Sequence, residues 1–260
     1  MDNVNKILFD VDGTITKTME RQEQWFKYWA KKNNVVWPHQ SFDEFLISYN
    51  ASLALGGAQK IYDDLGLPCN MEDRNHFVWK AFEDFNVENS PELYPQMEMV
   101  IKTLVKMKNS FGKEIRLGIN TSNSAKTVYS DLKKYGIFDY FDFLITADTL
   151  KYIAGERKVE DLKKPNNFSV GLALKLWGCY PEEMIFVGDT LDDLKSSLVT
   201  NKKRVITVGA LYGYEGEKLK RGAELGDIVD EEKIKLTFDH FIQKPTDLLK
   251  LVKSEYGFRF

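Results

Sequence analysis

Short apolar runs alternate with amphipathic stretches along most of the chain. Two stretches with helical periodicity, residues 125–135 and 168–177, end beside Gly136 and Gly178, and glycine is a common stop signal for a helix. Strands that alternate with helices in this way predict a parallel sheet with right-handed crossovers, and therefore a doubly wound α/β fold. The runs with the length and composition of buried strands are residues 6–9, 115–119, 143–145, 184–187, 205–208 and 228–229.

The stretch between the first two predicted strands has a different pattern. Apolar and aromatic residues recur there at helical spacing, as in the pair Trp25 and Trp29, which indicates helices with one buried face. We therefore expect residues 16–90 to form an all-helical domain, inserted into a core domain made of residues 1–15 and 91–260. The two tryptophans are interpreted as packing residues of this domain, with stacking on a substrate as the alternative.

The composition of the 260 residues narrows the class of protein. Basic residues number 36 and acidic residues 39, for a net charge of −3, which argues against a nucleic-acid binder because such proteins usually carry a basic excess. No apolar run approaches the roughly 18 residues of a membrane span. The two cysteines, Cys69 and Cys179, lack metal or redox spacing. We expect a cytoplasmic protein without membrane or nucleic-acid partners, either a monomer or a homodimer.

The first strand ends in two carboxylates. Asp10 and Asp12 flank a single residue, so in extended backbone they lie on one face of the strand. Gly13 then lets the backbone turn away. Asp10 can attack phosphorus as a nucleophile, and Asp12 can protonate the leaving oxygen and then activate water. A solvated turn is the alternative interpretation of this segment, because aspartate and glycine are common turn residues.

Two later segments supply candidate phosphate ligands. Thr121 and Ser122 follow the second strand and precede a helix, where hydroxyl and backbone N–H groups can bind an anion; an ordinary helix N-cap is the alternative. Lys164 stands before Pro165 and a predicted helix, and its ammonium group could hold a phosphoryl group. Lys163 would serve almost as well by sequence alone.

More carboxylates follow the strand at residues 184–187. Asp189 comes directly after that strand and Gly188, and Asp193 lies four residues further on. Carboxylate oxygens from several strand ends suit Mg²⁺, which prefers hard oxygen ligands and also binds substrate phosphate. We therefore expect Asp10, Asp12, Asp189 and Asp193 to form a Mg²⁺ site. A negatively charged first helical turn is the alternative, since the helix dipole favours acidic residues there.

Taken together, these four segments resemble the motifs of the haloacid dehalogenase superfamily of phosphohydrolases. Residues 9–15 read Phe-Asp-Val-Asp-Gly-Thr-Ile and residues 188–193 read Gly-Asp-Thr-Leu-Asp-Asp, which are similar to its first and fourth motifs. Thr121 fits the second motif and the pair Lys164-Pro165 the third. The resemblance implies a Rossmann-like core with an inserted helical cap, as in the branch of phosphoglycolate phosphatase and β-phosphoglucomutase.

The same resemblance implies a role for each site residue. It implies that Asp10 is the nucleophile and forms an aspartyl-phosphate. It also implies that Asp12 is the acid and base. It implies that Asp10, the backbone carbonyl of Asp12 and Asp189 bind Mg²⁺ with support from Asp193, while Thr121 and Lys164 hold the phosphoryl oxygens. This sequence departs from the branch at Lys17 and Thr18, where an acidic residue and a serine are common, and at Asn166-Asn167, after the lysine-proline pair.

The function expected from these features is Mg²⁺-dependent hydrolysis of a small phosphorylated metabolite. A phosphomutase would use the same nucleophile but return the phosphoryl group to its substrate. A dehalogenase does not need Asp12 as an acid, and a non-enzymatic binding protein would not need the complete set of groups. Substrate choice is expected to depend on the helical domain, where Gln59 and Lys60, beside Gly56-Gly57, are candidate contacts; a solvated helix start is the alternative.

Overall fold

The computed structural model describes residues 3–71, 73, 75–155, 159–200, 203–224 and 235–260. The chain forms two compact units, one made of Met1–Lys17 with Glu92–Phe260 and the other of Thr18–Pro91. We call them the core unit and the helical unit. The strand expected at residues 228–229 lies outside the described residues. That the helical unit is a cap stays a prediction at this point.

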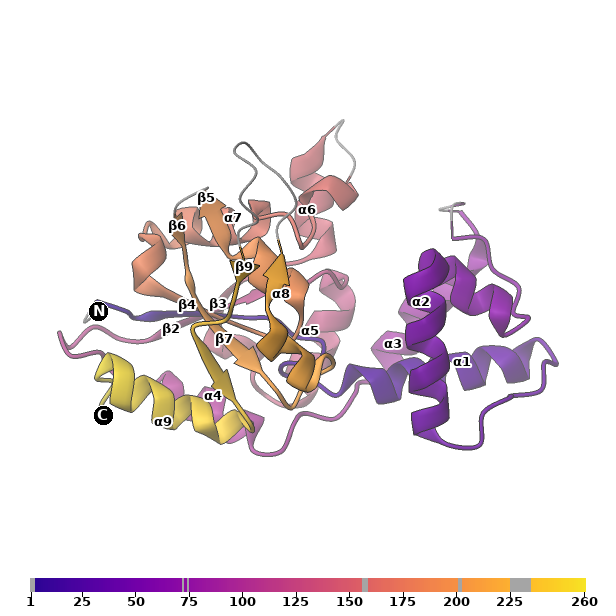
Figure 1. The fold of residues 1–260 in the computed structure, drawn as a ribbon, viewed down its shortest axis with the longest axis horizontal. Helices are drawn as coiled ribbons and strands as arrows, with labels where there is room; N and C mark the ends of the chain where they lie inside the picture. Colours follow the sequence, from indigo (N-terminus) through magenta and orange to yellow (C-terminus); the bar gives the residue numbers. More distant parts are fainter. Residues whose placement is uncertain (1–2, 72, 74, 156–158, 201–202, 225–234) are drawn as a thin grey trace. The chain divides into compact units, whose positions relative to one another are not determined.

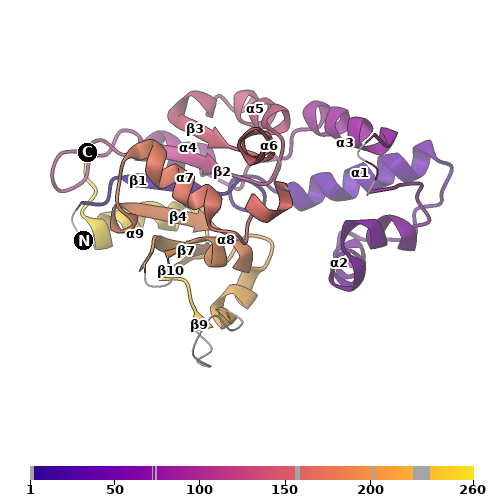
Figure 2. The same cartoon turned by 90° about the horizontal axis from the view of Figure 1, so that it is seen from above.

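The core unit is built on a six-stranded sheet with the order β10-β7-β4-β1-β2-β3, in which every neighbouring pair is parallel. Figure 1 shows this sheet with helices packed around it, and Figure 2 shows β1, β4 and β7 side by side. The predicted doubly wound, Rossmann-like α/β fold is confirmed. The strands are β1 (Lys6–Phe9), β2 (Arg116–Asn120), β3 (Phe141–Ile145), β4 (Met184–Gly188), β7 (Ile206–Ala210) and β10 (His240–Ile242).

Five of the six strands coincide with predicted apolar runs to within two residues. The sixth, β10, was missed, because it has only three residues and begins with His240, so it shows no apolar run. Two small antiparallel pairs were missed for the same reason of length. They are β5 (Leu198–Thr200) with β6 (Lys203–Arg204), and β8 (Ala223–Glu224) with β9 (Lys235–Leu236).

Helices cover both faces of the sheet because successive strand residues point to opposite sides. In β1, Ile7 and Phe9 pack with residues of α4, α5 and α9, whereas Leu8 packs with residues of α6 and α7. Both faces are therefore buried, which explains the continuous apolar runs in the sequence. The helices are α4 (Met97–Leu104), α5 (Ala125–Lys134), α6 (Ala147–Ala154), α7 (Phe168–Trp177), α8 (Leu191–Ser196) and α9 (Pro245–Tyr256).

The helical unit has a core of its own, rich in aromatic rings. Trp25 and Trp29 are fully buried and stacked, with ring centroids 5.0 Å apart. Their indole N–H groups donate to the hydroxyl of Tyr62 at 2.8 Å and to the carbonyl of Pro68 at 3.1 Å. The interpretation of both tryptophans as packing residues is therefore confirmed. The helices of this unit are α1 (Thr18–Lys32), α2 (Phe42–Asp64) and α3 (Phe77–Glu88).

Helix α2 is interrupted at Gly56 and Gly57, which have non-helical backbone angles. Gly57 has a φ of 68°, a conformation that residues with a side chain rarely adopt. Just after the break, Gln59 donates to the carbonyl of Cys69 and accepts from the amide of Met71. Its side chain therefore ties the following loop to α2. None of the helices in the described part of the chain is long and apolar enough to cross a membrane.

One glycine in the sheet gives a test of how tightly the core is packed. A Cβ atom at Gly118 in β2 would lie 2.9 Å from ring atoms of both Phe143 and Trp177. We expect Gly118→Ala to lower the free energy of unfolding by about 1–3 kcal/mol, because the rings would have to leave their packed positions. Urea denaturation followed by circular dichroism measures this change.

The matched control is Gly171→Ala in α7, where a Cβ would meet nothing within 4 Å. Alanine in a helix is more stable than glycine by roughly 0.5–1 kcal/mol, so this variant is expected to be stabilised. If both substitutions changed the free energy of unfolding in the same direction, the packing argument for Gly118 would be wrong.

Candidate active site

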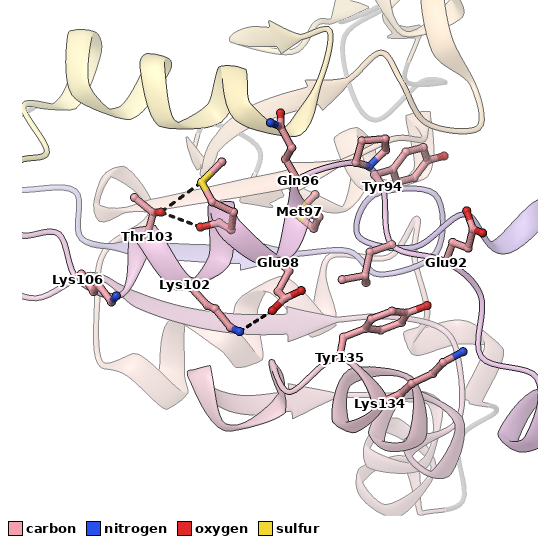
Figure 3. A pocket seen from close by; sticks show the side chains of 13 residues that line it. Glu92, Tyr94, Gln96, Met97, Glu98, Lys102, Thr103, Lys106, Lys134 and Tyr135 are labelled. Atoms are coloured by element: carbon pink, nitrogen blue, oxygen red, sulfur yellow. Dashed lines mark hydrogen bonds and ion pairs between the residues drawn. The ribbon is translucent and has the colours of Figure 1, made fainter.

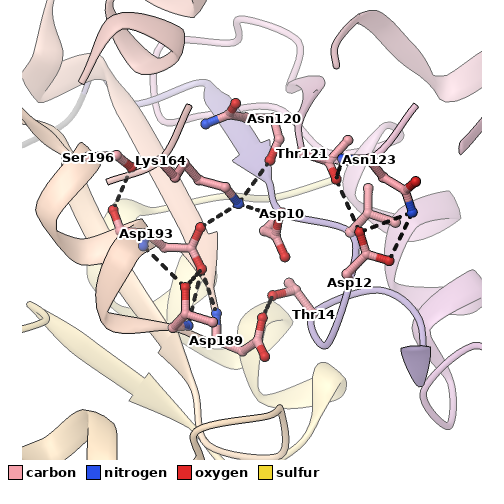
Figure 4. Close-up of polar contacts among 12 residues, drawn as sticks. Asp10, Asp12, Thr14, Asn120, Thr121, Asn123, Lys164, Asp189, Asp193 and Ser196 are labelled. Carbon is pink, nitrogen blue, oxygen red and sulfur yellow. Dashed lines mark hydrogen bonds and ion pairs between the residues drawn. The ribbon is translucent and has the colours of Figure 1, made fainter. Parts of the chain in front are cut away.

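The candidate site residues lie at the carboxyl ends of three adjacent strands. Asp10 follows β1, Thr121 follows β2 and Asp189 follows β4, and β1 pairs with both of the other strands. Parallel strands end at the same edge of a sheet, which is where open α/β folds bind ligands. Lys164, from the segment before α7, points into the same region (Figure 4).

Three carboxylates and one ammonium group meet at this edge. Asp10, Asp189 and Asp193 each offer an oxygen, and these oxygens lie within 4.8 Å of one another. All three residues are at most 4% exposed. The Nζ atom of Lys164 lies 2.5 Å from Oδ1 of Asp10 and 2.7 Å from Oδ1 of Asp193. Of the two lysines left open by the sequence, Lys164 is the one whose ammonium reaches these carboxylates.

The surroundings of Asp10, Asp189 and Lys164 shift the pKa of each group. Burial raises the pKa of Asp10 well above its usual value; Lys164 opposes this shift, and the neighbouring carboxylates add to it. Burial, followed by the charge of Asp193, raises the pKa of Asp189 to about 7. Burial alone would lower the pKa of Lys164, but Asp10 and Asp193 raise it above the usual value. One ammonium group does not balance three carboxylates. The cluster therefore carries excess negative charge that a bound cation would neutralise.

The donor set fits Mg²⁺. Buried carboxylate oxygens are the hard ligands that this ion prefers, and it keeps positions for water and phosphate. Glycines leave room for the carboxylates, since a Cβ at Gly13 would lie 2.1 Å from Oδ2 of Asp189, and a Cβ at Gly188 would lie 2.5 Å from Cβ of Asp193. Any side chain at Gly13 or Gly188 would therefore collide with Asp189 or Asp193, two of the residues that would hold the ion.

Hydrogen bonds orient the two carboxylates that follow β4. Asp189 accepts from the hydroxyl of Thr14 at 2.9 Å and from the amide of Tyr214 at 2.7 Å. Oδ2 of Asp193 accepts hydrogen bonds from the backbone amides of Asp189 and Thr190 and from the Thr190 hydroxyl. Its other oxygen accepts from Lys164. Asp193 is therefore held in place to support the cluster.

Asp12 lies apart from the buried cluster and is partly exposed. The hydroxyl of Thr121 donates to its Oδ2 at 3.2 Å, and the side-chain amide of Asn123 lies 3.4 Å from both of its oxygens. Ser122 is exposed on the same loop. A partly exposed carboxylate with neutral hydrogen-bond donors can exchange a proton with a substrate or water, which suits an acid and base.

Several residues of this site escaped prediction from the sequence. Thr14 and Asn123 stood inside recognised segments, and their side chains turn out to contact Asp189 and Asp12. Tyr214 donates its backbone amide to Asp189, a contact that the identity of its side chain does not predict. Asp192, in contrast, is half-exposed. Its Oδ1 lies 3.7 Å from Nζ of Lys195, so its carboxylate faces away from the cluster.

A separate groove of about 900 Å³ runs along α4 and the end of α5. Glu98 and Lys102 form an ion pair at its side, and Tyr94 and Tyr135 flank its other end (Figure 3). No residue of the carboxylate cluster lines this groove. Its size therefore does not mark the site of chemistry, which is defined by the charged groups at the strand ends.

Comparison with known proteins agrees with this fold and these motifs. A family model described as haloacid dehalogenase-like hydrolase matches residues 7–207, a span that includes every motif residue discussed above. The chain therefore belongs to the haloacid dehalogenase-like hydrolases, and the resemblance identified from the motifs is confirmed. Among curated relatives, pyrophosphatase PpaX of Bacillus velezensis is 29% identical over 249 residues, covering 95% of this chain and 96% of that protein. PpaX of Bacillus pumilus is 25% identical, with coverage of 97% and 98%.

Solved structures share the fold over nearly the whole chain. A predicted phosphoglycolate phosphatase from Haemophilus somnus aligns with a TM-score of 0.66 at 20% identity, covering 97% of this chain and 99% of that one. CbbY from Rhodobacter sphaeroides, solved in complex with phosphate, aligns with a TM-score of 0.59 at 20% identity, covering 94% and 96%. Both similarities concern the fold.

Proposed function

We propose that this protein is a Mg²⁺-dependent phosphatase that hydrolyses a small phosphorylated metabolite through an aspartyl-phosphate. The observation that carries this proposal is the contact of Lys164 with Asp10 inside a buried group of carboxylates, with Asp12 two residues further along the chain. A buried carboxylate paired with an ammonium group is a candidate nucleophile, and the partly exposed carboxylate two residues further along the chain is a candidate acid.

In the first step, a carboxylate oxygen of Asp10 attacks phosphorus and the bond from phosphorus to the leaving oxygen breaks. The leaving oxygen takes a proton from Asp12, which must start as the carboxylic acid. Lys164, together with the hydroxyls of Thr121 and Ser122, would bind the phosphoryl oxygens. Thr121 already donates to Asp12, so it lies beside the position where the phosphoryl group would transfer.

In the second step, Asp12 accepts a proton from water, and the water oxygen attacks phosphorus of the aspartyl-phosphate. The bond to Asp10 breaks, which releases inorganic phosphate and restores the carboxylate. Asp12 returns to its acid form, so that atoms and protons balance over the cycle. Few groups are needed because phosphoryl transfer depends mainly on positioning and on charge neutralisation.

The residues that would hold Mg²⁺ are Asp10, the backbone carbonyl of Asp12 and Asp189, with Asp193 in support. When bound, the ion would neutralise negative charge on the transferring phosphoryl group. The buried carboxylates support this assignment, because burial and mutual repulsion raise the pKa of Asp10 and Asp189. A cation there would stabilise their ionised forms.

We further propose that the helical unit acts as the cap that selects the substrate. It is inserted between the first and second motifs, so it can differ among relatives without altering the strand ends of the core. Gln59 is bound within the unit to Cys69 and Met71, and Lys60 pairs with Asp64. Neither side chain therefore supports the earlier suggestion of a substrate contact.

The nucleophile is tested by Asp10→Asn. We expect turnover of p-nitrophenyl phosphate in saturating Mg²⁺ to fall by at least about 1000-fold, because an amide is a poor nucleophile. Release of nitrophenolate measures the rate, and circular dichroism shows that the variant is folded.

The control for this change is Asp192→Asn, the same substitution on a half-exposed carboxylate beside the cluster. It is expected to keep turnover within about twofold of the wild-type protein, since surface changes usually have small effects. Activity of Asp10→Asn near the wild-type level, in a preparation free of contaminating phosphatase, would refute the proposed nucleophile.

The acid role predicts a dependence on the leaving group in Asp12→Ala. A basic alkoxide needs a proton as it leaves, whereas a nitrophenolate does not. We expect burst experiments on the first step to show a loss of about 100-fold or more for an alkyl phosphate, and about tenfold for p-nitrophenyl phosphate. Measuring the first step separately avoids the water-activation step. Equal losses on both substrates would show that Asp12 is not the acid.

Inorganic pyrophosphate is a second candidate substrate. The observation that favours it is the alignment with proteins named pyrophosphatase PpaX over nearly the full length of both chains. Pyrophosphate would use the same groups, with phosphate as the leaving group. We expect its kcat/KM to exceed that of phosphoglycolate and of hexose phosphates by tenfold or more if this candidate is correct. A monoester with the higher kcat/KM in the same phosphate-release assay would reject pyrophosphate as the main substrate.

A further inference from the structure

A tyrosine outside the four motif segments described above contacts the first of them. Tyr212 lies in the loop after β7 and is partly buried. Its hydroxyl donates to the backbone carbonyl of Thr14 at 3.0 Å. Thr14 is fully buried, and its own hydroxyl donates to Oδ1 of Asp189. A single residue, Thr14, therefore connects the Tyr212 hydroxyl to Asp189, a carboxylate of the candidate Mg²⁺ site.

The position of Tyr212 is set by a second tyrosine. The ring of Tyr94 packs edge-on against the ring of Tyr212, with centroids 4.7 Å apart. The backbone amide of Tyr94 donates to the carbonyl of Ile15 at 3.0 Å. Two successive carbonyls of the first-motif loop, those of Thr14 and Ile15, are thus held by this pair of tyrosines.

The two residues after Tyr212 contact Asp189 directly. A Cβ at Gly213 would lie 2.2 Å from Cβ of Asp189 and 2.5 Å from the carbonyl of Gly13, so the chain passes in close contact with both. The amide of Tyr214 then donates to Oδ2 of Asp189. One three-residue segment therefore holds Asp189 on one side and the Thr14 loop on the other.

We infer that Tyr212 is a positioning residue: through the Thr14 carbonyl it orients the Thr14 hydroxyl toward Asp189 and so holds that carboxylate ready for the metal ion. The inference rests on the proposed function, because it concerns the same metal site. Without the tyrosine hydroxyl, the Thr14 carbonyl loses this donor and the threonine side chain is less well fixed. A carboxylate that is not held in place loses affinity for its ion.

The test measures metal binding without turnover. Mn²⁺ takes carboxylate ligands as Mg²⁺ does, and the electron paramagnetic resonance signal of free Mn²⁺ reports how much is bound. We expect Tyr212→Phe in the full-length protein to raise the Mn²⁺ dissociation constant about tenfold. The kcat at saturating Mg²⁺ is expected to stay within about threefold, because the chemical groups remain.

The matched control is Tyr256→Phe. Tyr256 is 2% exposed in α9, and its hydroxyl pairs with Nε2 of His240 at 2.7 Å, so this change also removes one partly buried hydrogen bond from the core unit. It is expected to lower thermal stability about as much as Tyr212→Phe, but to leave Mn²⁺ affinity unchanged. Equal losses of affinity in both variants, or none in Tyr212→Phe, would overturn the inference.

A double-mutant cycle tests the route through Thr14. Thr14→Val removes the hydroxyl that donates to Asp189 and keeps the backbone carbonyl. In this background, Tyr212→Phe is expected to change Mn²⁺ affinity by less than twofold, because its effect passes through the missing hydroxyl. If the two losses multiplied in full, Tyr212 would act by another route and the inference would be wrong.

The same measurements separate this inference from the proposed function. A wild-type protein that binds Mn²⁺ but cleaves neither phosphate esters nor pyrophosphate would refute the proposed phosphatase, while the affinity of Tyr212→Phe would still decide the inference. A wild-type protein that binds no Mn²⁺ would overturn both the metal site and the role of Tyr212.

Discussion

The constraint on which the core unit depends is the burial of three carboxylates, Asp10, Asp189 and Asp193, beside the ammonium group of Lys164. Burying charge without full compensation is costly, and replacing such a cluster with apolar residues is often neutral or stabilising. The apolar faces of the sheet must offset this cost. An arrangement that opposes stability at the carboxyl edge of a parallel sheet is typical of a functional site, and this edge is where the proposed cation and phosphorylated substrate would bind.

The architecture holds these charges in place at two levels. Asp10 follows β1 in the middle of the sheet, and its amide still donates to the carbonyl of Val187 at 2.9 Å, which continues the strand ladder to Asp10 itself. The side chains are then oriented by loops: Thr14 and Tyr214 donate to the two oxygens of Asp189. The strands thus set where each group lies, and the loops set which way it points.

This division explains what could be predicted from the sequence. Strands that are buried on both faces appear as apolar runs, so the sheet and the residues at its ends were predictable, including Asp10 and Asp189. Strand β10 was not, because three residues carry too little pattern. Contacts such as that between Thr14 and Asp189 join residues 175 positions apart, and they depend on loop backbone rather than on local periodicity. The choice of Lys164 over Lys163 has the same origin.

The distribution of chemical groups separates catalysis from substrate choice. Every group proposed for phosphoryl transfer belongs to the core unit, from Asp10 to Asp193. The helical unit contributes none of them, and its buried tryptophans, Trp25 and Trp29, serve its own packing. Relatives with this fold include proteins named as a pyrophosphatase and as a predicted phosphoglycolate phosphatase, so the shared core does not specify one substrate. Under the function proposed above, selection among substrates falls to the helical unit, which is inserted after the first strand and holds none of these carboxylates.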